Sequence, residues 1–350
     1  MEHLDLSGRL TGPGHTPYVI AEIGANHNGD MALCRQMIRE AARCGADAVK
    51  FQSWTAESLI SSAEYGRNAA YSDPERHFGS LKEMVERYQL SAAQHREVAA
   101  YCREEGVHFM STPFSPAEVD LLAELGVPAL KIASMDVTHP ELLKYAAQTG
   151  LPIILSTGMA SLAEVGAALE TLQQHGSGGV ALLHCISIYP PDYEDIHLRN
   201  IPMLASAFGV PVGFSDHSFG TAVPLAAVAL GACILEKHFT TDKSLQGWDH
   251  LISADPPELA AICREAKNVF TALGHAHRTV SPAELEKRKR FRRCVVLKRD
   301  VAAGETLTGA DLDYKRPGTG IAPTEAPYVV GRRAARDLTR DHELAWSDLA

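Results

Sequence analysis

The stretch PVGFSDHSFGTAVPLAAVALGACILEKHF, residues 211–239, carries the clearest fold signal in the sequence. Its pattern predicts a strand at 212–214, a polar turn, an alanine-rich helix and a second strand that ends at His238. A strand, a helix and a strand within so few residues form a βαβ unit, whose two strands run parallel. We therefore expect His217 and His238, which stand at the ends of these strands, to lie side by side at the carboxyl edge of a sheet, where α/β proteins bind their ligands.

The same alternation of short apolar strands and helical segments recurs along the chain. Polar clusters follow further predicted strands at 18–23, 48–51, 108–110, 129–132, 153–155 and 180–184. Eight such units favour a closed (β/α)₈ barrel of about 250 residues. A doubly wound open sheet is the alternative, but the G-x-G-x-x-G fingerprint of its nucleotide-binding form does not follow the first strand. A long segment at 53–79 is predicted to be an irregular insertion that covers a site or makes a subunit contact.

The character of the sequence changes after residue 280. A basic run, SPAELEKRKRFRR, occupies 281–293, and the β-like runs CVVL, LDYK and YVVGRRAARDL follow between turn-forming sequences. We therefore predict an α/β barrel domain at 1–280, a linker at 281–293 and a small β-rich domain at 294–350. A domain of that size buries only a marginal core, so we expect it to pack on a barrel, its own or a partner's.

Composition narrows the classes of partner. The chain has 350 residues, a net charge of −10 and a charged content of 22%, so neither nucleic acid nor an anionic membrane is an expected partner. The sequence lacks a signal-like start and an apolar run of about 18 residues, and we expect a cytoplasmic protein. Its seven cysteines include no C-x-x-C pair and are predicted to be reduced, mostly buried thiols.

Two lysines stand within apolar strands. Lys50 lies in AVKFQ and Lys131 lies in ALKIA, where a buried cation is unfavourable unless an anion meets it. A Ser or Thr after a strand more often starts a turn or caps a helix. Together with the lysines, however, such hydroxyls at the same edge favour a small phosphorylated anion as the ligand.

The paired histidines indicate a divalent metal. A single histidine after a strand is more often a hydrogen-bonded residue than a ligand, but two neutral imidazoles without a Cys partner suit an ion such as Mn²⁺ that completes its shell with water and substrate oxygens. A closed zinc site would need four protein ligands. With Glu22 as an isolated carboxylate, this set fits a reaction in which an ion polarises a carbonyl, a phosphorylated carbon nucleophile attacks it and Glu22 orients or deprotonates a hydroxyl.

The order of these motifs resembles that of a known family. The motifs AEIGANHNGD, AVKFQ, STPFS, LKIAS, PIILSTGM, LLHCISIYP, GFSDHS and LEKHFT, followed by VLKRDVAAGETLTGADLDYKRPGTG, resemble the bacterial sialic acid (N-acetylneuraminate) synthases and their nonulosonate relatives. The resemblance implies a (β/α)₈ barrel and an antifreeze-like (SAF) domain that is swapped in a homodimer. It also implies condensation of phosphoenolpyruvate with an N-acylated mannose-like sugar, with Mn²⁺ or Mg²⁺ bound, to give a nine-carbon 2-keto acid and phosphate.

The resemblance assigns roles to residues, motif by motif. The metal would be held by His217 and His238, and the catalytic residues would be Glu22, Lys50 and Lys131. Phosphoenolpyruvate would be bound by Lys50, Thr112, Lys131, Ser134, Ser187 and Ser215. The sugar would face Glu22, Gln52, Phe114, Asp136, Tyr189, Asp249 and, from the other subunit, Arg316.

Two motifs depart from the sialic-acid pattern. KIASMD stands where that pattern has KIGSGE, so Asp136 is one methylene shorter than Glu, and Ser187 replaces an Asn. With the bulky Trp248 beside Asp249, these departures leave the identity of the sugar open. Two alternative functions also remain: a pyruvate-dependent class II-like aldolase, which releases no phosphate, and a non-enzymatic carbohydrate-binding protein.

Overall fold

The computed structural model describes residues 3–69 and 79–350. The chain divides into two compact units, residues 1–274 and residues 275–350. Part of the predicted insertion, residues 70–78, lies outside the described residues. No helix of the described residues is long and apolar enough to cross a membrane.

The first unit is built around a parallel sheet that curves into a barrel. Among the described residues, eight strands are hydrogen-bonded in the order β5-β4-β3-β10-β9-β8-β7-β6, and β5 and β6 contact each other where the cylinder closes. The predicted (β/α)₈ barrel is therefore confirmed. The strands are β3 (Tyr18–Gly24), β4 (Ala48–Ser53), β5 (His108–Pro113), β6 (Leu130–Ile132), β7 (Ile153–Ser156), β8 (Val180–Cys185), β9 (Val212–Asp216) and β10 (Ile234–His238).

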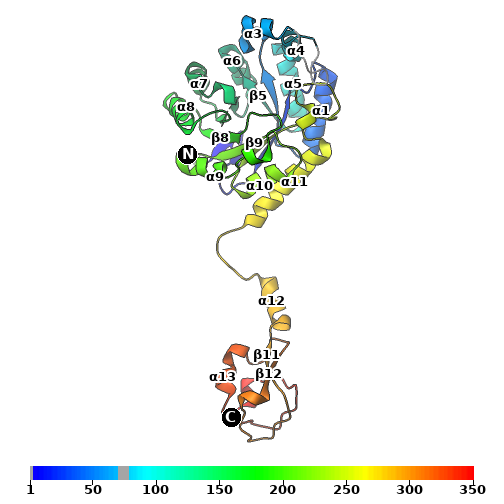
Figure 1. Ribbon diagram of the computed structural model, residues 1–350, viewed down its shortest axis with the longest axis vertical. Helices are drawn as coiled ribbons and strands as arrows, with labels where there is room; N and C mark the ends of the chain where they lie inside the picture. The colour runs from blue at the N-terminus through cyan, green and yellow to red at the C-terminus, as the bar shows by residue number, and fades with distance from the viewer. Residues whose placement is uncertain (1–2, 70–78) are drawn as a thin grey trace. The chain divides into compact units, whose positions relative to one another are not determined.

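Helices surround the strands, as Figure 1 shows. Asp30 caps the first of them, because its side chain accepts from the amides of Ala32 and Leu33. Thr221 stands at the N-cap position of α10, but its side chain makes no capping hydrogen bond. The helices are α1 (Met31–Cys44), α4 (Leu81–Tyr88), α5 (Ala92–Glu105), α6 (Pro116–Leu125), α7 (Pro140–Ala147), α8 (Leu162–Gln174), α9 (Asn200–Phe208), α10 (Ala222–Ala229) and α11 (Pro256–Leu273).

The segment predicted to be irregular contains two short helices, α2 (Ala56–Leu59) and α3 (Ser62–Arg67). Each begins at a hydroxyl side chain that accepts an amide hydrogen from the first turn, Thr55 from Ser58 and Ser61 from Glu64. The prediction of an irregular segment was wrong here, because capping side chains stabilise helices too short to show a clear apolar period.

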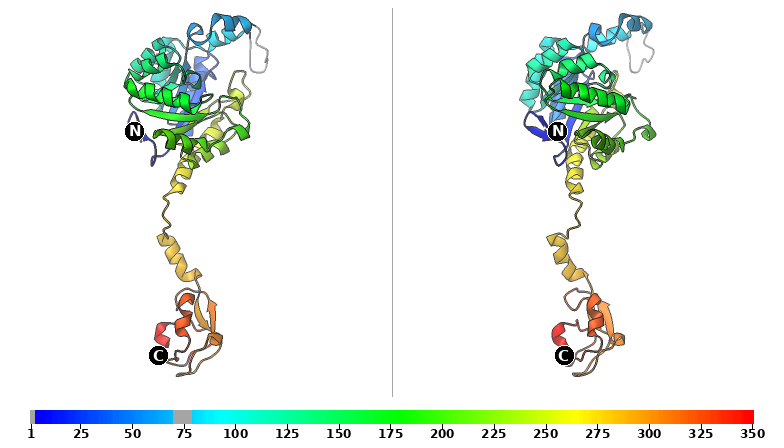
Figure 2. Two further views of the ribbon diagram at one scale, coloured as in Figure 1. Left: turned by 60° about the vertical axis from the view of Figure 1, so that its left-hand side comes forward. Right: turned by 90° about the vertical axis from the view of Figure 1, so that its left-hand side faces the viewer.

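An N-terminal hairpin fills the amino end of the barrel. Its antiparallel strands are β1 (Leu4–Leu6) and β2 (Arg9–Thr11). Leu4 and Leu6 are buried in the same apolar cluster as Tyr18 and Ile20. In both views of Figure 2 the hairpin and the segment with α2 and α3 lie at opposite ends of the barrel. Polar side chains that point into the barrel can therefore gather only at the carboxyl end.

Gly213 in β9 lies where the barrel wall leaves no room for a side chain. A Cβ atom there would stand 2.5 Å from Ile234 O and 2.6 Å from Leu183 Cδ2. We expect Gly213→Ala to lower the free energy of unfolding by about 1–3 kcal/mol through overpacking, measured by urea denaturation. Gly166→Ala in α8, where the new Cβ would make only an ordinary 3.6 Å contact with Phe208, is the matched control and should not destabilise. Equal stability of both variants would contradict this interpretation.

The second unit begins with a helix. Residues predicted to be a linker form α12 (Pro282–Phe291), and the strands β11 (Cys294–Leu297) and β12 (Leu312–Lys315) pair antiparallel. Buried Val295, Leu297 and Leu344 belong to a separate small core. The run YVVGRRAARDL is not one strand as predicted. It starts within α13 (Ala326–Val329), where Pro327 in the first turn favours a helix over the β propensity of the valines.

The predictions for the cysteines are confirmed in this structure. All seven are free thiols, and six of them are buried, Cys44 being the half-buried one.

Candidate active site

A cavity of about 300 Å³ opens at the carboxyl end of the barrel. The predicted anion-binding lysines and the predicted metal-binding histidines line this same cavity. Twelve residues predicted from the sequence line it: Glu22, Lys50, Gln52, Thr112, Phe114, Lys131, Ser134, Ser187, Tyr189, Ser215, His217 and His238.

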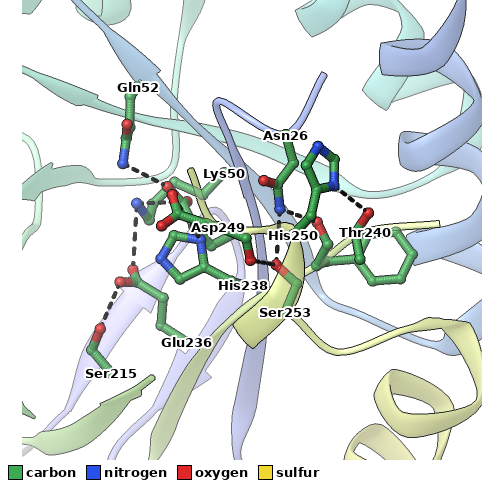
Figure 3. A network of polar contacts seen from close by, with 12 residues as sticks. Asn26, Lys50, Gln52, Ser215, Glu236, His238, Thr240, Asp249, His250 and Ser253 are labelled. Carbon is green, nitrogen blue, oxygen red and sulfur yellow. Dashed lines mark hydrogen bonds and ion pairs between the residues drawn. The ribbon is translucent and has the colours of Figure 1, made fainter. Parts of the chain in front are cut away.

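The floor of the cavity is a network of buried charges (Figure 3). Lys50 Nζ lies 2.6 Å from Glu22 Oε2 and 3.7 Å from Glu236 Oε2. Lys131 Nζ lies 3.6 Å from Glu236 Oε1, and Ser215 Oγ donates to the same carboxylate at 3.0 Å. Two carboxylates of the protein thus supply counter-charge to the two lysines, which the sequence analysis had assigned to a ligand alone.

The pKa values of Glu22 and Glu236 are shifted in opposite directions. Burial raises the pKa of Glu22 to about 7, although Lys50 opposes the shift. Burial also acts to raise the pKa of Glu236, but Lys131 and Lys50 outweigh it and hold that pKa below its usual value. Near neutral pH the Glu22 carboxyl is therefore partly protonated while Glu236 is charged. Two ammonium groups then face less than two full negative charges, which leaves an attraction for an anion.

This shift predicts a pH-dependent stability. Between pH 4.5 and about 7 the folded Glu22 carboxyl keeps a proton that the unfolded carboxyl has lost. The free energy of unfolding should therefore fall as the pH rises through this interval, by at most about 3 kcal/mol. Glu22→Gln should remove this part of the slope, measured by urea denaturation from pH 4.5 to 7.5. Identical slopes for the wild type and the variant would contradict the raised pKa.

Hydroxyl groups surround the lysines. Thr112 Oγ1 accepts from Lys50 Nζ at 3.2 Å. Ser134 and Ser187 converge on Gly158, where a Cβ would stand 2.3 Å from Ser187 Oγ and 2.9 Å from Ser134 Oγ. Ser156, which the sequence analysis did not select, also lines the cavity, and its buried Oγ lacks a hydrogen-bond partner within the described residues. Ser156 could have been predicted in the same way as Ser215, because each is a serine at the end of a predicted strand.

The two histidines lie next to each other as the βαβ unit predicts. Their ring centroids are 5.4 Å apart, and the ring of Tyr189 lies 3.9 Å from that of His217. His217 Nδ1 is 2.8 Å from Ile186 O, which fixes a proton on Nδ1 in the neutral ring and leaves Nε2 as an acceptor. His238 Nδ1 is buried, makes no hydrogen bond within the described residues and lies 3.8 Å from Asp249 Oδ2.

This donor set fits a metal ion that shares its shell with substrate. Burial keeps the pKa of His238 well below its usual value, as a neutral ligand requires. Burial acts in the same direction on His217, but its contact with Cys185 raises that pKa. No group of three or more His, Cys, Asp and Glu side chains suited to a metal occurs in the described part of the chain. An ion held by this pair would therefore be open to water and substrate on its other sides.

Three predicted site residues lie elsewhere. Asp136 ends the 3₁₀ turn η1 (Ser134–Asp136) and does not line the cavity, whereas its neighbour Met135 does. Asp249 stands beside His238 but outside the cavity lining. Arg316 belongs to the second unit, where its guanidinium lies 4.9 Å from the centre of the Phe291 ring.

Glu236 is the main residue to which the sequence analysis gave no role. It stands two positions before His238 in β10, so both side chains point to the same face of the strand. From this two-residue spacing, Glu236 could have been predicted to line the same site as the two histidines.

Comparison with known proteins identifies the family. Residues 37–278 match the model of the NeuB family, and residues 292–350 match that of the SAF domain. The chain belongs to the NeuB family. The predicted family and its C-terminal SAF domain are thereby confirmed, and so is the enzyme class, a carbon–carbon bond-forming transferase of the N-acetylneuraminate synthase type.

NeuB-family relatives match along almost the whole chain. The N,N'-diacetyllegionaminic acid synthase of Legionella pneumophila is 40% identical over 346 residues, covering 97% of this chain and 96% of its own. The pseudaminic acid synthase of Helicobacter pylori is 32% identical over 339 residues, covering 95% and 98%. The crystal structure of the N-acetylneuraminic acid synthetase of Leptospira borgpetersenii with citrate superposes with a TM-score of 0.74 at 35% identity, covering 81% of this chain and 94% of that one.

Proposed function

We propose that this protein condenses phosphoenolpyruvate with an N-acylated mannose-like hexose to give a nine-carbon 2-keto acid and phosphate. The observation that supports this most directly is the cavity floor, where Lys50 and Lys131 face an incomplete negative charge next to strand-end hydroxyls. A phosphorylated carboxylate would supply the missing charge. The names of the relatives, which are nonulosonate synthases, support a sugar as the second substrate.

In this proposal one group of residues binds phosphoenolpyruvate and another binds the sugar. Lys50, Lys131 and the hydroxyls of Thr112, Ser134 and Ser215 would hold the phosphate and carboxylate of phosphoenolpyruvate by charge-assisted hydrogen bonds. C3 of phosphoenolpyruvate then attacks the aldehyde carbon of the open-chain sugar, water adds at C2, and phosphate leaves with the bridging oxygen. Further contacts to phosphoenolpyruvate from Ser187, and to the sugar from Gln52, Phe114, Asp136, Tyr189 and Asp249, are part of the same proposal.

Glu22 is suited to move a proton at the reacting end of the sugar. Its pKa of about 7 lets it exist in both forms at neutral pH, the property of an efficient acid–base group. Gln52 Nε2 donates to Glu22 Oε1 at 3.2 Å and holds that carboxyl in place. A divalent ion, Mn²⁺ or Mg²⁺, held by His217 and His238, would supply Lewis-acid polarisation of the aldehyde carbonyl.

Phosphate release tests the reaction. The protein is incubated with Mn²⁺, phosphoenolpyruvate carrying ¹⁸O in the bridging position, and each of a panel of N-acylated hexoses. We expect sugar-dependent release of phosphate that contains the ¹⁸O, and a product whose mass is that of a nine-carbon 2-keto acid. Product formed from pyruvate without phosphate release would favour the aldolase instead. Sugar binding by residues 275–350 with no turnover of any substrate would favour a carbohydrate-binding protein.

We also propose a homodimer in which the barrel of 1–280 and the SAF domain of 294–350, joined by the segment 281–293, come from different subunits at each site. Residues 275–350 carry more Lys and Arg than Asp and Glu although the whole chain has a net charge of −10, so this unit has charge complementarity to an acidic barrel. Leu285 and Phe291 of α12 are exposed and provide apolar contact surface.

Subunit complementation tests this arrangement. Arg316→Ala and His217→Ala subunits are each expected to be inactive, and mixing them in a swapped dimer restores one intact site per mixed dimer. Recovery of activity after mixing and refolding, with a dimer mass from light scattering, would support the exchange. No recovery in mixed dimers would contradict it.

A further inference from the structure

A loop of residues 240–253 leaves the end of β10 and returns beside it. Its two ends are joined by backbone hydrogen bonds from Thr240 N to Ala254 O at 3.0 Å and from Ala254 N to His238 O at 2.7 Å. The loop carries Asp249, whose Oδ2 lies 3.8 Å from Nδ1 of His238. The position of Asp249 therefore depends on the contacts that hold the loop residues around it.

Asn26, in the turn that follows β3, holds both ends of the loop. It follows β3, is 1% exposed and is 213 positions away from Phe239 in the sequence. Its Nδ2 donates to Phe239 O at 2.9 Å and to Ser253 Oγ at 2.8 Å. Ser253 Oγ in turn donates to Asp249 O at 2.7 Å. Figure 3 shows this chain of hydrogen bonds, which runs from Asn26 to the backbone of Asp249.

A second set of contacts fixes the outer part of the loop. Asn28 Nδ2 donates to Gln246 O at 2.9 Å, and Thr240 Oγ1 lies 2.7 Å from Nδ1 of the fully buried His250. These contacts orient the loop as a whole, whereas Asn26 reaches the turn that carries Asp249. Because Asn26 and Ser253 are buried, water cannot replace the lost hydrogen bonds without rearrangement.

We propose that Asn26 is a positioning residue for the sugar side of the site, and that it acts by setting Asp249 against His238. This inference rests on the proposed function, in which Asp249 faces the sugar. The lysines assigned to phosphoenolpyruvate lie on β4 and β6, and their hydrogen bonds and ion pairs are to Glu22, Thr112, Ile132 and Glu236, which lie outside the loop. A defect at Asn26 should therefore change the Michaelis constant for the sugar and not that for phosphoenolpyruvate.

Hydrogen exchange and steady-state kinetics test the proposal together. In Asn26→Ala we expect the amides of 240–253 to exchange about tenfold faster, which corresponds to one or two lost hydrogen bonds, with exchange in β7 and β8 unchanged. The KM for the sugar should rise about tenfold, while the KM for phosphoenolpyruvate changes less than about twofold. Ser253→Ala, a smaller deletion, should show the same pattern more weakly. Asn268→Ala, on the exposed surface of α11, is the matched control without effect.

A double-mutant cycle separates positioning from general destabilisation. If Asn26 acts through Asp249, adding Asn26→Ala to Asp249→Asn should raise the sugar KM by less than about a further twofold. Fully multiplicative effects, or unchanged exchange of the loop in both Asn26→Ala and Ser253→Ala, would overturn the proposal. Exchange is measured without substrate, so it still tests the anchoring if the proposed reaction is not observed.

Discussion

Replacing His217, the proposed metal ligand, with alanine should lower kcat for the proposed condensation by at least about 100-fold, because loss of a ligand has a larger effect than loss of a residue that only orients one. The fold should survive. The side chain lines the cavity, and loss of its hydrogen bond to Ile186 O costs about 1 kcal/mol. The thermal midpoint should then fall by about 2–4 °C. Initial rates with Mn²⁺, calorimetric Mn²⁺ titration and thermal unfolding check these expectations.

His184→Ala is the matched control for this variant. His184 is also a buried histidine near the end of a barrel strand, but its Nε2 bonds to Ile196 O at 2.6 Å and it does not line the candidate cavity. Its replacement should reduce stability and leave Mn²⁺ binding unchanged. Full activity of His217→Ala in the presence of a chelator would remove the metal from the mechanism.

Replacing Lys131 with methionine should raise the KM for phosphoenolpyruvate about 10–100-fold. This range corresponds to the free energy lost with one charge-assisted hydrogen bond. Lys131 Nζ has only long contacts in the described part of the protein, 3.3 Å to Ile132 O and 3.6 Å to Glu236 Oε1. Methionine keeps the apolar stem but removes the charge that an anionic substrate would meet. Steady-state kinetics at saturating sugar measure the change.

Lys237→Met provides the comparison. Lys237 is another buried lysine of a barrel strand, but it pairs with Asp216 at 2.9 Å and lies outside the cavity lining. Its loss leaves the Asp216 carboxylate buried without its cation, which should destabilise the fold by about 3–5 kcal/mol. The KM for phosphoenolpyruvate in the folded fraction should not change. An equal rise of that KM in both variants would show that the effect at Lys131 is structural.

The barrel could be predicted because its signals are local. Each strand is a short apolar run followed by a polar cluster, and the βαβ connection of 211–239 makes the two histidine-bearing strands parallel neighbours. The strand lysines were found because a cation in an apolar strand is anomalous. The short helices α2 and α3 were missed, since side-chain caps stabilise them without an apolar period.

Other parts of the site depend on contacts between distant segments. Glu236 becomes the shared partner of Lys50 and Lys131 only because three separate strands converge. The hydrogen bonds of Asn26 to Phe239 and Ser253 likewise link positions more than 200 residues apart. A single sequence contains no signal for such pairs.

The order of the barrel strands, and with it the end of the barrel to which each polar cluster belongs, could therefore be predicted from the sequence alone. These features follow from the local period of apolar residues and from the handedness and short reach of the connections. Which side chains meet depends instead on the tertiary fold. The register of β3 and β4 shifts between Glu22 and Gly24, and it pairs Glu22 with Lys50. A shift of one residue changes the face to which a side chain points, and only the closed barrel fixes it.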